Sequence, residues 1–537
     1  MKLNKKNKLI LISKYNLDLL SQIINNQNLK NCKIECSNFN GNLEIFLMNK
    51  KNILNKDYAF IFEDISDISD EFKKSLYNEE VNFKKFENEI KNYCKSISLL
   101  KKNVSKIFIS NLEIYEKSNH LNIFTHFKKE RGPSYLINAA NNLIANFIDN
   151  SRDIFLIDNS KLSNIKVNYS NHYTAKFPIE IENIKKIADN LINGILNLKG
   201  DSKKLIICDL DNTLWGGILG DVGYEKINLG GHDLVGEAHR DLQIFLKFLK
   251  NQGTMLAICS KNEMKNVEEA FRKNENMILT LDDFVEVKCN WDDKAKNINE
   301  ILKNINITSS HTVFIDDSKV ERERIKNVFS EIECPEYFEN ILTANENFFR
   351  EKWFHNPYFT REDKNRTSSY LASKVIKKID NKNLSNKELS NWIKKLNVKV
   401  LKKDLNKDNL TRTIQLFNKT NQLNSITRRL NEKELKNWLK VNGANINLYY
   451  VSDKFAEYGL TVILTYKKIK NKIEIFDFLM SCRIAGRNVE HQIIEKISDK
   501  NKKKIEINFK HSKKNKPMYD LLVKIGFNFK NGKFTKN

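Results

Sequence analysis

Short apolar runs, each followed by a longer polar or mixed stretch, recur along the chain before Gly200. Runs of about four to eight apolar or alternating residues are typical of β-strands, and the stretches between them are long enough for helices. This alternation predicts an α/β layer fold. The predicted strands are Leu9–Ser13, Leu43–Met48, Tyr58–Phe62, Lys106–Ser110 and Asp153–Asp158.

The same alternation continues from about residue 200 to 345. Helices are predicted at Glu237–Lys250 and Lys294–Ile305, and the apolar residues of the second helix share one face. The pattern indicates a second α/β unit. Its predicted strands are Leu205–Asp209, Met255–Cys259, Phe284–Val287 and Thr312–Asp316.

Beyond residue 345 the pattern changes twice. Residues 346–390 are polar with helical character, which indicates a connector. A mixed segment follows to the end, in which a helix is predicted to begin near Gly486. Three strands are predicted before that helix, at Ile446–Val451, Leu460–Tyr466 and Ile473–Leu479.

A chain of 537 residues is longer than a single hydrophobic core supports, so several domains are expected. We predict a multi-domain α/β protein with a Rossmann-like core, an α/β domain before it and an α+β domain after it. The predicted parts are residues 1–195, 196–345, the connector 346–390, and 391–537.

The formal net charge is +24, which is typical of nucleic-acid-binding proteins. Lysine is nevertheless spread along the whole chain together with many Asn and Ile residues, so we interpret it as solvated surface and predict no nucleic-acid partner. The densest lysine runs, Lys502–Lys504 and Lys510–Lys516, would attract acidic partners.

No apolar run approaches the roughly 18 residues that cross a bilayer, and Leu9–Ile12 is too short for a signal-peptide core. We therefore expect a cytoplasmic protein without a membrane partner. The eight cysteines form no CxxC pair, which argues against a zinc site or a disulfide framework.

Two carboxylates follow the first strand of the second unit, in the sequence Asp209-Leu-Asp211-Asn-Thr213. At the carboxyl end of a parallel strand both can point into the crevice where such folds bind ligands. One acid can attack phosphorus, and the other can protonate the leaving oxygen and later activate water. We assign Asp209 to the first role and Asp211 to the second.

Polar residues also follow the next three strands. Ser260, Lys261 and Asn262 could hold phosphoryl oxygens through the Ser260 hydroxyl and the backbone N–H groups after it. Lys294 could neutralise the nucleophile and the phosphate. Asp316 and Asp317 complete an oxygen-rich set that suits Mg²⁺.

These four segments, in this order and at these spacings, resemble the haloacid-dehalogenase superfamily, and in particular its FkbH-like (IIIC) branch. The resemblance covers roughly residues 5 to 530 and is strongest at 205–325. It is carried by DLDNTLWGGILGDVG (209–223), CSKN (259–262), NWDDKAKNI (290–298), FIDDSKVERE (314–323) and TREDKNR (360–366).

The resemblance implies that Asp209 is the nucleophile, Asp211 the acid/base, and Ser260 and Lys294 the phosphate ligands. It further implies that Mg²⁺ is bound by Asp209, the backbone carbonyl of Asp211 and Asp316. Asp317 is either a metal ligand or a carboxylate behind one. Lys296 is the alternative for the lysine role, and Trp215 either gates the site on a flap or packs beside Gly216 and Gly217.

The spacing of the motifs leaves no room for a separate cap domain. Only 34 positions separate Ser260 from Lys294 (294 − 260), and core elements use most of them. An uncapped site either acts on a large substrate or borrows a wall from a neighbouring domain.

The segment Arg483-Ile-Ala-Gly486-Arg487-Asn488 resembles the pyrophosphate loop of GNAT acetyltransferases, although Asn488 replaces the usual Gly or Ala. Backbone N–H groups and the Arg483 and Arg487 guanidiniums would then bind coenzyme A, or a phosphopantetheine thioester in its place. Further resemblance lies in KTNQLNSITRR (419–429), LMSCRIAGRNVE (479–490) and the Tyr519 to Gly526-Phe527 element.

Cys482 stands beside Arg483 and just before a helix. This position would lower its pKa and make it a candidate to carry an acyl group as a thioester. The alternative is a small buried residue that closes a strand. His491 could act as a base or could lie on a helix surface.

The N-terminal domain of FkbH-like proteins looks like a divergent SGNH hydrolase. Here Ser13-Lys-Tyr-Asn16 replaces Gly-Asp-Ser, and Tyr169 stands three residues before His172 where an Asp would be expected. We therefore expect a scaffold, docking or lid role without a working triad.

The resemblance implies a bifunctional glyceryltransferase and phosphatase. Such an enzyme takes a small acyl phosphate, typically 1,3-bisphosphoglycerate, removes the remaining phosphate and loads the glyceryl group on an acyl carrier protein. One alternative is a phosphatase or acyltransferase acting on a sugar intermediate in surface-polysaccharide synthesis. Another is a scaffold protein that retains only phosphatase activity.

Overall fold

The structure is a computed structural model that describes the chain from Asn7 to Lys536 with gaps. The gaps are residues 28–32, 49–55, 114–123, 160–168, 356–366, 371–396, 454–456, 470–471, 485–486, 499–503 and 513–514. The single residues 150, 152, 178, 201, 232, 352, 368, 369 and 421 are also outside it. Most of the predicted connector, residues 346–390, therefore lies outside the described residues. Among the described helices, none combines the length and apolar character needed to span a bilayer.

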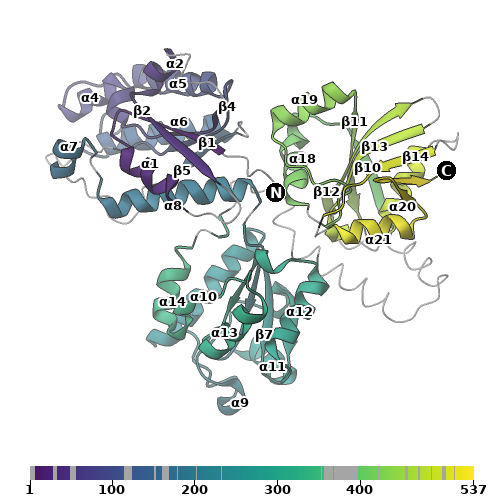
Figure 1. The fold of residues 1–537 in the computed structure, drawn as a ribbon. Coiled ribbons are helices and arrows are strands. Elements are labelled where there is room, and N and C mark those ends of the chain that lie inside the picture. Colours follow the sequence, from purple (N-terminus) through teal and green to yellow (C-terminus); the bar gives the residue numbers. More distant parts are fainter. Residues whose placement is uncertain are drawn as a thin grey trace. The chain divides into compact units, whose positions relative to one another are not determined.

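The chain divides into two compact units, Met1–Leu196 and Asn197–Asn537. The first unit contains a five-stranded parallel sheet in the order β2-β1-β3-β4-β5, with helices on both of its faces (Figure 1). The strands are β1 (Asn7–Ser13), β2 (Ile34–Asn40), β3 (Lys56–Ile61), β4 (Val104–Ser110) and β5 (Ile154–Ile157). The helices are α1 (Asp18–Asn25), α2 (Leu43–Met48), α3 (Ile65–Ile68), α4 (Asp70–Leu76), α5 (Phe83–Leu100), α6 (Pro133–Asp149), α7 (Tyr169–Ala175) and α8 (Ile181–Leu198).

The prediction of a strand at Leu43–Met48 was wrong, because these residues form the helix α2. Leu43 and Phe46 are buried three positions apart, whereas Ile45 and Met48 are exposed, so the burial follows helical spacing. The Asn42 side chain accepts a hydrogen bond from the Ile45 backbone N–H at 3.0 Å, as an N-cap does. A short apolar run does not distinguish helix from strand by itself, and here the cap decided the outcome.

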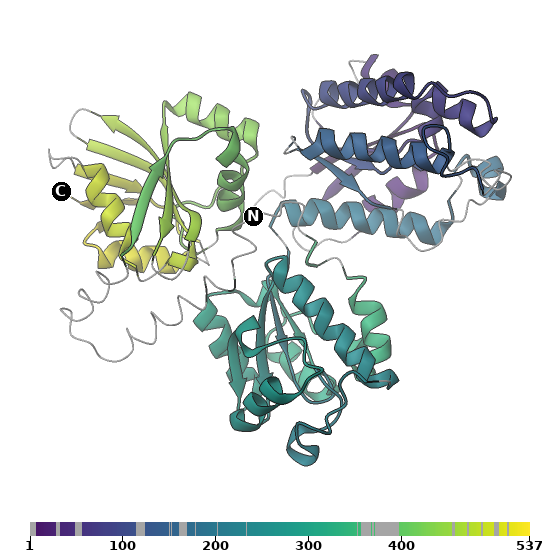
Figure 2. The same ribbon diagram turned by 180° about the vertical axis from the view of Figure 1, so that it is seen from behind.

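The second unit begins with a four-stranded parallel sheet in the order β8-β7-β6-β9. Its strands are β6 (Leu205–Cys208), β7 (Met255–Ser260), β8 (Phe284–Cys289) and β9 (Thr312–Ile315). One face packs against α10 (Leu234–Asn251), α11 (Met264–Lys273) and α14 (Ile341–Phe348). The other face packs against α12 (Lys294–Ile305) and α13 (Lys319–Val328), and the short helix α9 (Leu219–Val222) follows β6. The view from behind in Figure 2 shows the layers of this sheet and its helices.

The remaining described residues form a seven-stranded mixed sheet in the order β10-β11-β12-β13-β14-β16-β15. Only β13 and β14 in it are parallel neighbours. The strands are β10 (Lys399–Lys403), β11 (Asn445–Ser452), β12 (Glu457–Ile469), β13 (Lys472–Met480), β14 (Lys504–Asn508), β15 (Asn528–Lys530) and β16 (Lys533–Lys536). Helices α18 (Lys407–Lys419) and α19 (Glu432–Asn442) cover one face, and α20 (Val489–Ser498) and α21 (Lys516–Lys524) cover the other. The predicted α/β, multi-domain class with parallel sheets is confirmed.

Candidate active site

The four sequence motifs of the second unit lie at the carboxyl edge of its parallel sheet. Asp209 directly follows β6, Ser260 ends β7, and Asp316 directly follows β9. Because β6 lies between β7 and β9, the residues at the three strand ends are neighbours in space. This is the edge at which open α/β sheets bind their ligands.

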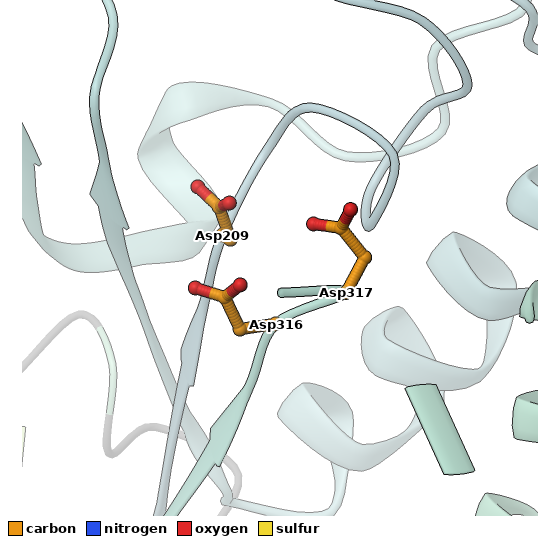
Figure 3. A group of neighbouring side chains, drawn as sticks. All are labelled: Asp209, Asp316 and Asp317. Atoms are coloured by element: carbon orange, nitrogen blue, oxygen red, sulfur yellow. The ribbon is translucent and has the colours of Figure 1, made fainter. Parts of the chain in front are cut away.

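Three carboxyl groups converge there. Asp209, Asp316 and Asp317 each offer an oxygen, and these oxygens all lie within 4.8 Å of one another. Figure 3 shows the three side chains directed toward a common space. The Oδ1 atom of Asp209 is buried and has no hydrogen-bond partner. A hard divalent cation such as Mg²⁺ fits these residues, because it prefers carboxylate oxygens and would satisfy the unpaired one.

Lys294 is the only side-chain cation that the structure shows paired with these carboxyls. Its Nζ lies 2.9 Å from Asp209 Oδ2 and 2.6 Å from Asp316 Oδ2, and the side chain is 4% exposed. Burial lowers the pKa of Lys294, but the two carboxylates outweigh burial and hold the pKa above its usual value. Lys294 therefore stays charged and can neutralise an anion beside Asp209.

The surroundings of Asp316 and Asp317, the two carboxyl groups after β9, disfavour their ionised forms. Burial, and then the neighbouring charge of Asp209, raises the pKa of both Asp316 and Asp317. A cation bound between the three carboxyls would reverse this effect, since it favours their ionised forms. The Asp317 backbone N–H donates to Thr213 Oγ1 at 3.0 Å, which joins the first and fourth motifs.

The Asp211 carboxylate lies apart from this cluster and accepts three hydrogen bonds. Its Oδ1 accepts from Trp215 Nε1 at 2.9 Å and from the Leu219 N–H at 3.1 Å. Its Oδ2 accepts from Asn262 Nδ2 at 2.9 Å, and the same amide donates to Ser260 Oγ at 3.1 Å. The Asn262 side chain thus orients Asp211 and Ser260, and phosphate binding by the backbone N–H groups after Ser260 stays a prediction.

Trp215 is a packed aromatic residue, which decides between the two alternatives for it. The side chain is fully buried, and its ring meets Phe271 edge to face at 5.8 Å between centroids. Its indole N–H is used by Asp211. Trp215 therefore supports the loop and does not gate the site.

The two exposed lysines near the site face solvent. Lys261 forms an ion pair with Glu321 at 2.6 Å, and Lys296 pairs with Asp292 at 3.0 Å. Lys296 points away from the carboxyl cluster, so Lys294 occupies the position expected of the phosphate-neutralising lysine.

Two buried polar residues of α10 support the catalytic loop and were missed by sequence reasoning. His239 Nδ1 lies 2.9 Å from the Thr213 carbonyl, and burial lowers the pKa of His239, so the ring is neutral. Gln243 Nε2 donates to the Leu214 carbonyl at 3.0 Å, and its Oε1 accepts from two backbone N–H groups. The signal was available, because both residues lie four positions apart on the apolar face of a predicted helix.

Arg487 of the C-terminal loop is not presented to a ligand, whereas Arg483 lines a cavity. Arg487 is fully buried: its Nε donates to Asp453 Oδ2 at 2.8 Å and its Nη2 to the Tyr458 hydroxyl at 2.6 Å. Its guanidinium also stacks on the Tyr458 ring, 4.4 Å from the centroid. Arg483 is 5% exposed and donates to Ser481 Oγ at 3.2 Å. The Arg487 guanidinium is therefore engaged within the fold, contrary to the role suggested by the sequence, and the role of Arg483 stays a prediction.

Two other predicted residues of this loop cannot be placed. Gly486 and the side chain of Cys482 lie outside the described residues. The backbone of Cys482 belongs to a short 3-10 helix, Cys482–Ile484. His491 lies on α20, partly exposed and 4.0 Å from Glu495, which matches a helix-surface histidine.

Ser13 of the first unit lies at the carboxyl end of β1 and is fully buried. Its hydroxyl accepts a hydrogen bond from the Tyr15 N–H at 3.0 Å, and the Tyr15 hydroxyl donates to Asp64 at 3.3 Å.

No protein-family model matches this chain, and a search of curated proteins gives no match. Among solved structures, it is similar to the N-terminal part of the protein BF1531 from Bacteroides fragilis, which contains a phosphatase domain and is complexed with Mg. The TM-score is 0.58 and the identity 26%, over 66% of this chain and 95% of that chain. The PaiA N-acetyltransferase from Thermoplasma acidophilum, in complex with coenzyme A, aligns with 26% of this chain and 96% of its own. Its TM-score of 0.19 and identity of 13% are too low to bear on the C-terminal sheet. The chain thus contains a domain similar to a phosphatase domain.

Proposed function

We propose that the domain built on β6 to β9 is a magnesium-dependent phosphatase in which Asp209 is transiently phosphorylated. The observation that carries this proposal is the group of three carboxyls, Asp209, Asp316 and Asp317, beside the buried ammonium of Lys294. The likeness to a phosphatase domain complexed with Mg supports it.

Bound at the three carboxyls, Mg²⁺ would draw the negative charge of the phosphate toward Asp209 and lower the repulsion between them. An Asp209 oxygen attacks phosphorus, the bond from phosphorus to the leaving oxygen breaks, and Asp211 gives that oxygen a proton. Asp211 then takes a proton from water, the water oxygen attacks phosphorus, and Asp209 is released with inorganic phosphate. Ser260 and Lys294 hold the phosphoryl oxygens in both steps.

We further propose that this activity serves an acyl transfer, in which a glyceryl group from a 1,3-bisphosphoglycerate-like donor is loaded on an acyl carrier protein. The motifs shared with FkbH-like proteins at 419–429 and 479–490 support this proposal. Cys482 remains the candidate to carry the acyl group as a thioester. Because Arg487 is engaged within the fold, it does not fit a coenzyme A pyrophosphate, and no step is assigned to that cofactor.

Intact-mass measurement tests both proposals. The pure protein is incubated with Mg²⁺, freshly generated 1,3-bisphosphoglycerate and an acyl carrier protein. A glyceryl adduct on the carrier is expected with the parent protein. Acyl transfer releases the carboxyl phosphate without Asp209, so an Asp209→Asn variant should give an adduct that keeps its remaining phosphate. A fully dephosphorylated adduct formed at the parent rate in that variant would contradict the phosphatase. Asp209-dependent release from free sugar phosphates, without any carrier adduct, would favour the polysaccharide alternative.

A further inference from the structure

Three large apolar side chains are exposed around the proposed phosphatase site. Ile218 is 49% exposed, Trp291 73% and Val320 74%. They belong to three different segments, which follow β6, β8 and β9 at the carboxyl edge of the sheet. We call these three residues the apolar rim.

Each rim residue is adjacent in sequence to a residue that contacts the site. The N–H of Leu219, next to Ile218, donates to Asp211. The N–H of Asn290, next to Trp291, donates to the Ser260 carbonyl at 3.2 Å. Glu321, next to Val320, pairs with Lys261, the residue after Ser260. The three rim residues therefore belong to segments that meet the site at the carboxyl edge of the sheet.

No inserted domain covers this edge in the described part of the second unit. Between β6 and β7 the chain forms α9 and α10, and between β7 and β8 it forms α11 and a 3-10 turn. Single exposed apolar residues are common, but apolar residues from three segments around one site indicate a binding surface. Covering an exposed apolar surface with another apolar group has a favourable free energy, because both surfaces are removed from water.

We propose that the apolar rim binds the leaving group of the substrate, and that the substrate is a phosphomonoester extended by an apolar arm. This inference rests on the proposed phosphatase function and names its substrate class. A free sugar phosphate does not belong to this class. Trp291 contributes the largest exposed area and is the main specificity-determining residue of the rim.

A series of n-alkyl phosphates tests the proposal, because ethyl, butyl and octyl phosphate have leaving groups of nearly equal basicity and differ only in apolar length. In the parent protein kcat/KM is expected to rise with chain length, by up to roughly fourfold per methylene for full burial. In Trp291→Ala the rise flattens, so that octyl phosphate loses roughly tenfold in kcat/KM while ethyl phosphate changes little. Because Trp291 is exposed, its replacement removes no core contact, and an unchanged circular dichroism spectrum together with the unchanged ethyl phosphate rate shows that the variant is folded.

Phe248→Ala is the matched control. Phe248 is an aromatic residue of α10 that is 54% exposed and lies near the carboxyl end of that helix, at the opposite edge of the sheet. It is expected to leave the whole series unchanged. Equal kcat/KM for all three alkyl phosphates in the parent, or an unchanged slope in Trp291→Ala, would overturn the proposal. Absence of Asp209-dependent hydrolysis of every phosphate would instead overturn the phosphatase itself.

Discussion

Two groups of buried charges in this protein differ in how completely they are balanced. At the carboxyl edge of the parallel sheet, three carboxyls face one ammonium, and an Asp209 oxygen has no partner. In the C-terminal sheet, one guanidinium faces one carboxylate, and Arg487 also meets the Tyr458 hydroxyl. A buried charge is costly unless it is paired, so we expect a ligand to complete the unbalanced group, whereas the balanced group needs none.

Asp209→Asn gives the largest expected effect. The amide is a poor nucleophile, so kcat for phosphate release should fall by at least about a thousandfold. The variant should remain folded, because it removes a negative charge from an excess of them. The kcat is measured as the release of inorganic phosphate from butyl phosphate. Asp282→Asn, a substitution at an exposed position in the same domain, is the control.

Arg487→Met should destabilise the C-terminal sheet without changing phosphatase kcat. It removes the guanidinium that neutralises the buried Asp453 carboxylate, which costs about 3–5 kcal/mol. Urea unfolding measures the loss, and Arg324→Met, which breaks an exposed pair with Asp293, should cost no more than about 1 kcal/mol. A loss as small as that of the control would show that the Arg487 pair is not structural.

Another buried carboxyl, Glu63, has no cation partner in the contacts that the structure gives, and burial raises its pKa to about 7. Since this pKa lies above the unfolded value, the folded state binds more protons between about pH 4.5 and 7, and stability falls as pH rises through that range. The loss amounts to about 3 kcal/mol when complete. Hydrogen exchange at β3 between pH 5 and 8, corrected for intrinsic rates, measures it.

The control for this pH dependence is Glu63→Gln, in which the part of the loss caused by Glu63 should disappear. Glu80→Gln, at an exposed position, should retain the pH-dependent loss of stability. A parent protein whose β3 protection is independent of pH would contradict the burial of an uncompensated carboxyl at position 63.

Magnesium should stabilise the second unit by somewhat less than the loss expected from Glu63. An ion present at about 100 times its Kd adds about 2.7 kcal/mol to the free energy of unfolding. Differential scanning calorimetry with Mg²⁺ and with EDTA should show a higher Tm with the ion, together with loss of phosphatase activity in EDTA. The Tm difference should shrink in Asp316→Asn, and an equal difference in that variant would place the ion elsewhere.

The parallel sheet of the second unit was predictable because its strands are buried on both faces and therefore form continuous apolar runs. The segment Leu43–Met48 has the same apolar content, but its burial follows helical spacing and its cap comes from Asn42. Lys294 and Lys296 stand two positions apart in one helical turn, and only their orientation separates the buried lysine from the exposed one.

The amino-acid sequence by itself determined the α/β class and the four motifs of the second unit, because apolar periodicity and motif spacing are local properties of the chain. Only the tertiary structure decided which charges are balanced. Asp453 is 34 positions from Arg487, and Asp316 is 107 positions from Asp209 (316 − 209), so neither pairing nor excess charge can be read along the chain. Folding pairs Arg487 with one carboxylate and places three carboxyls beside the single Lys294. The order of the strands, and not distance along the sequence, determines which side chains meet.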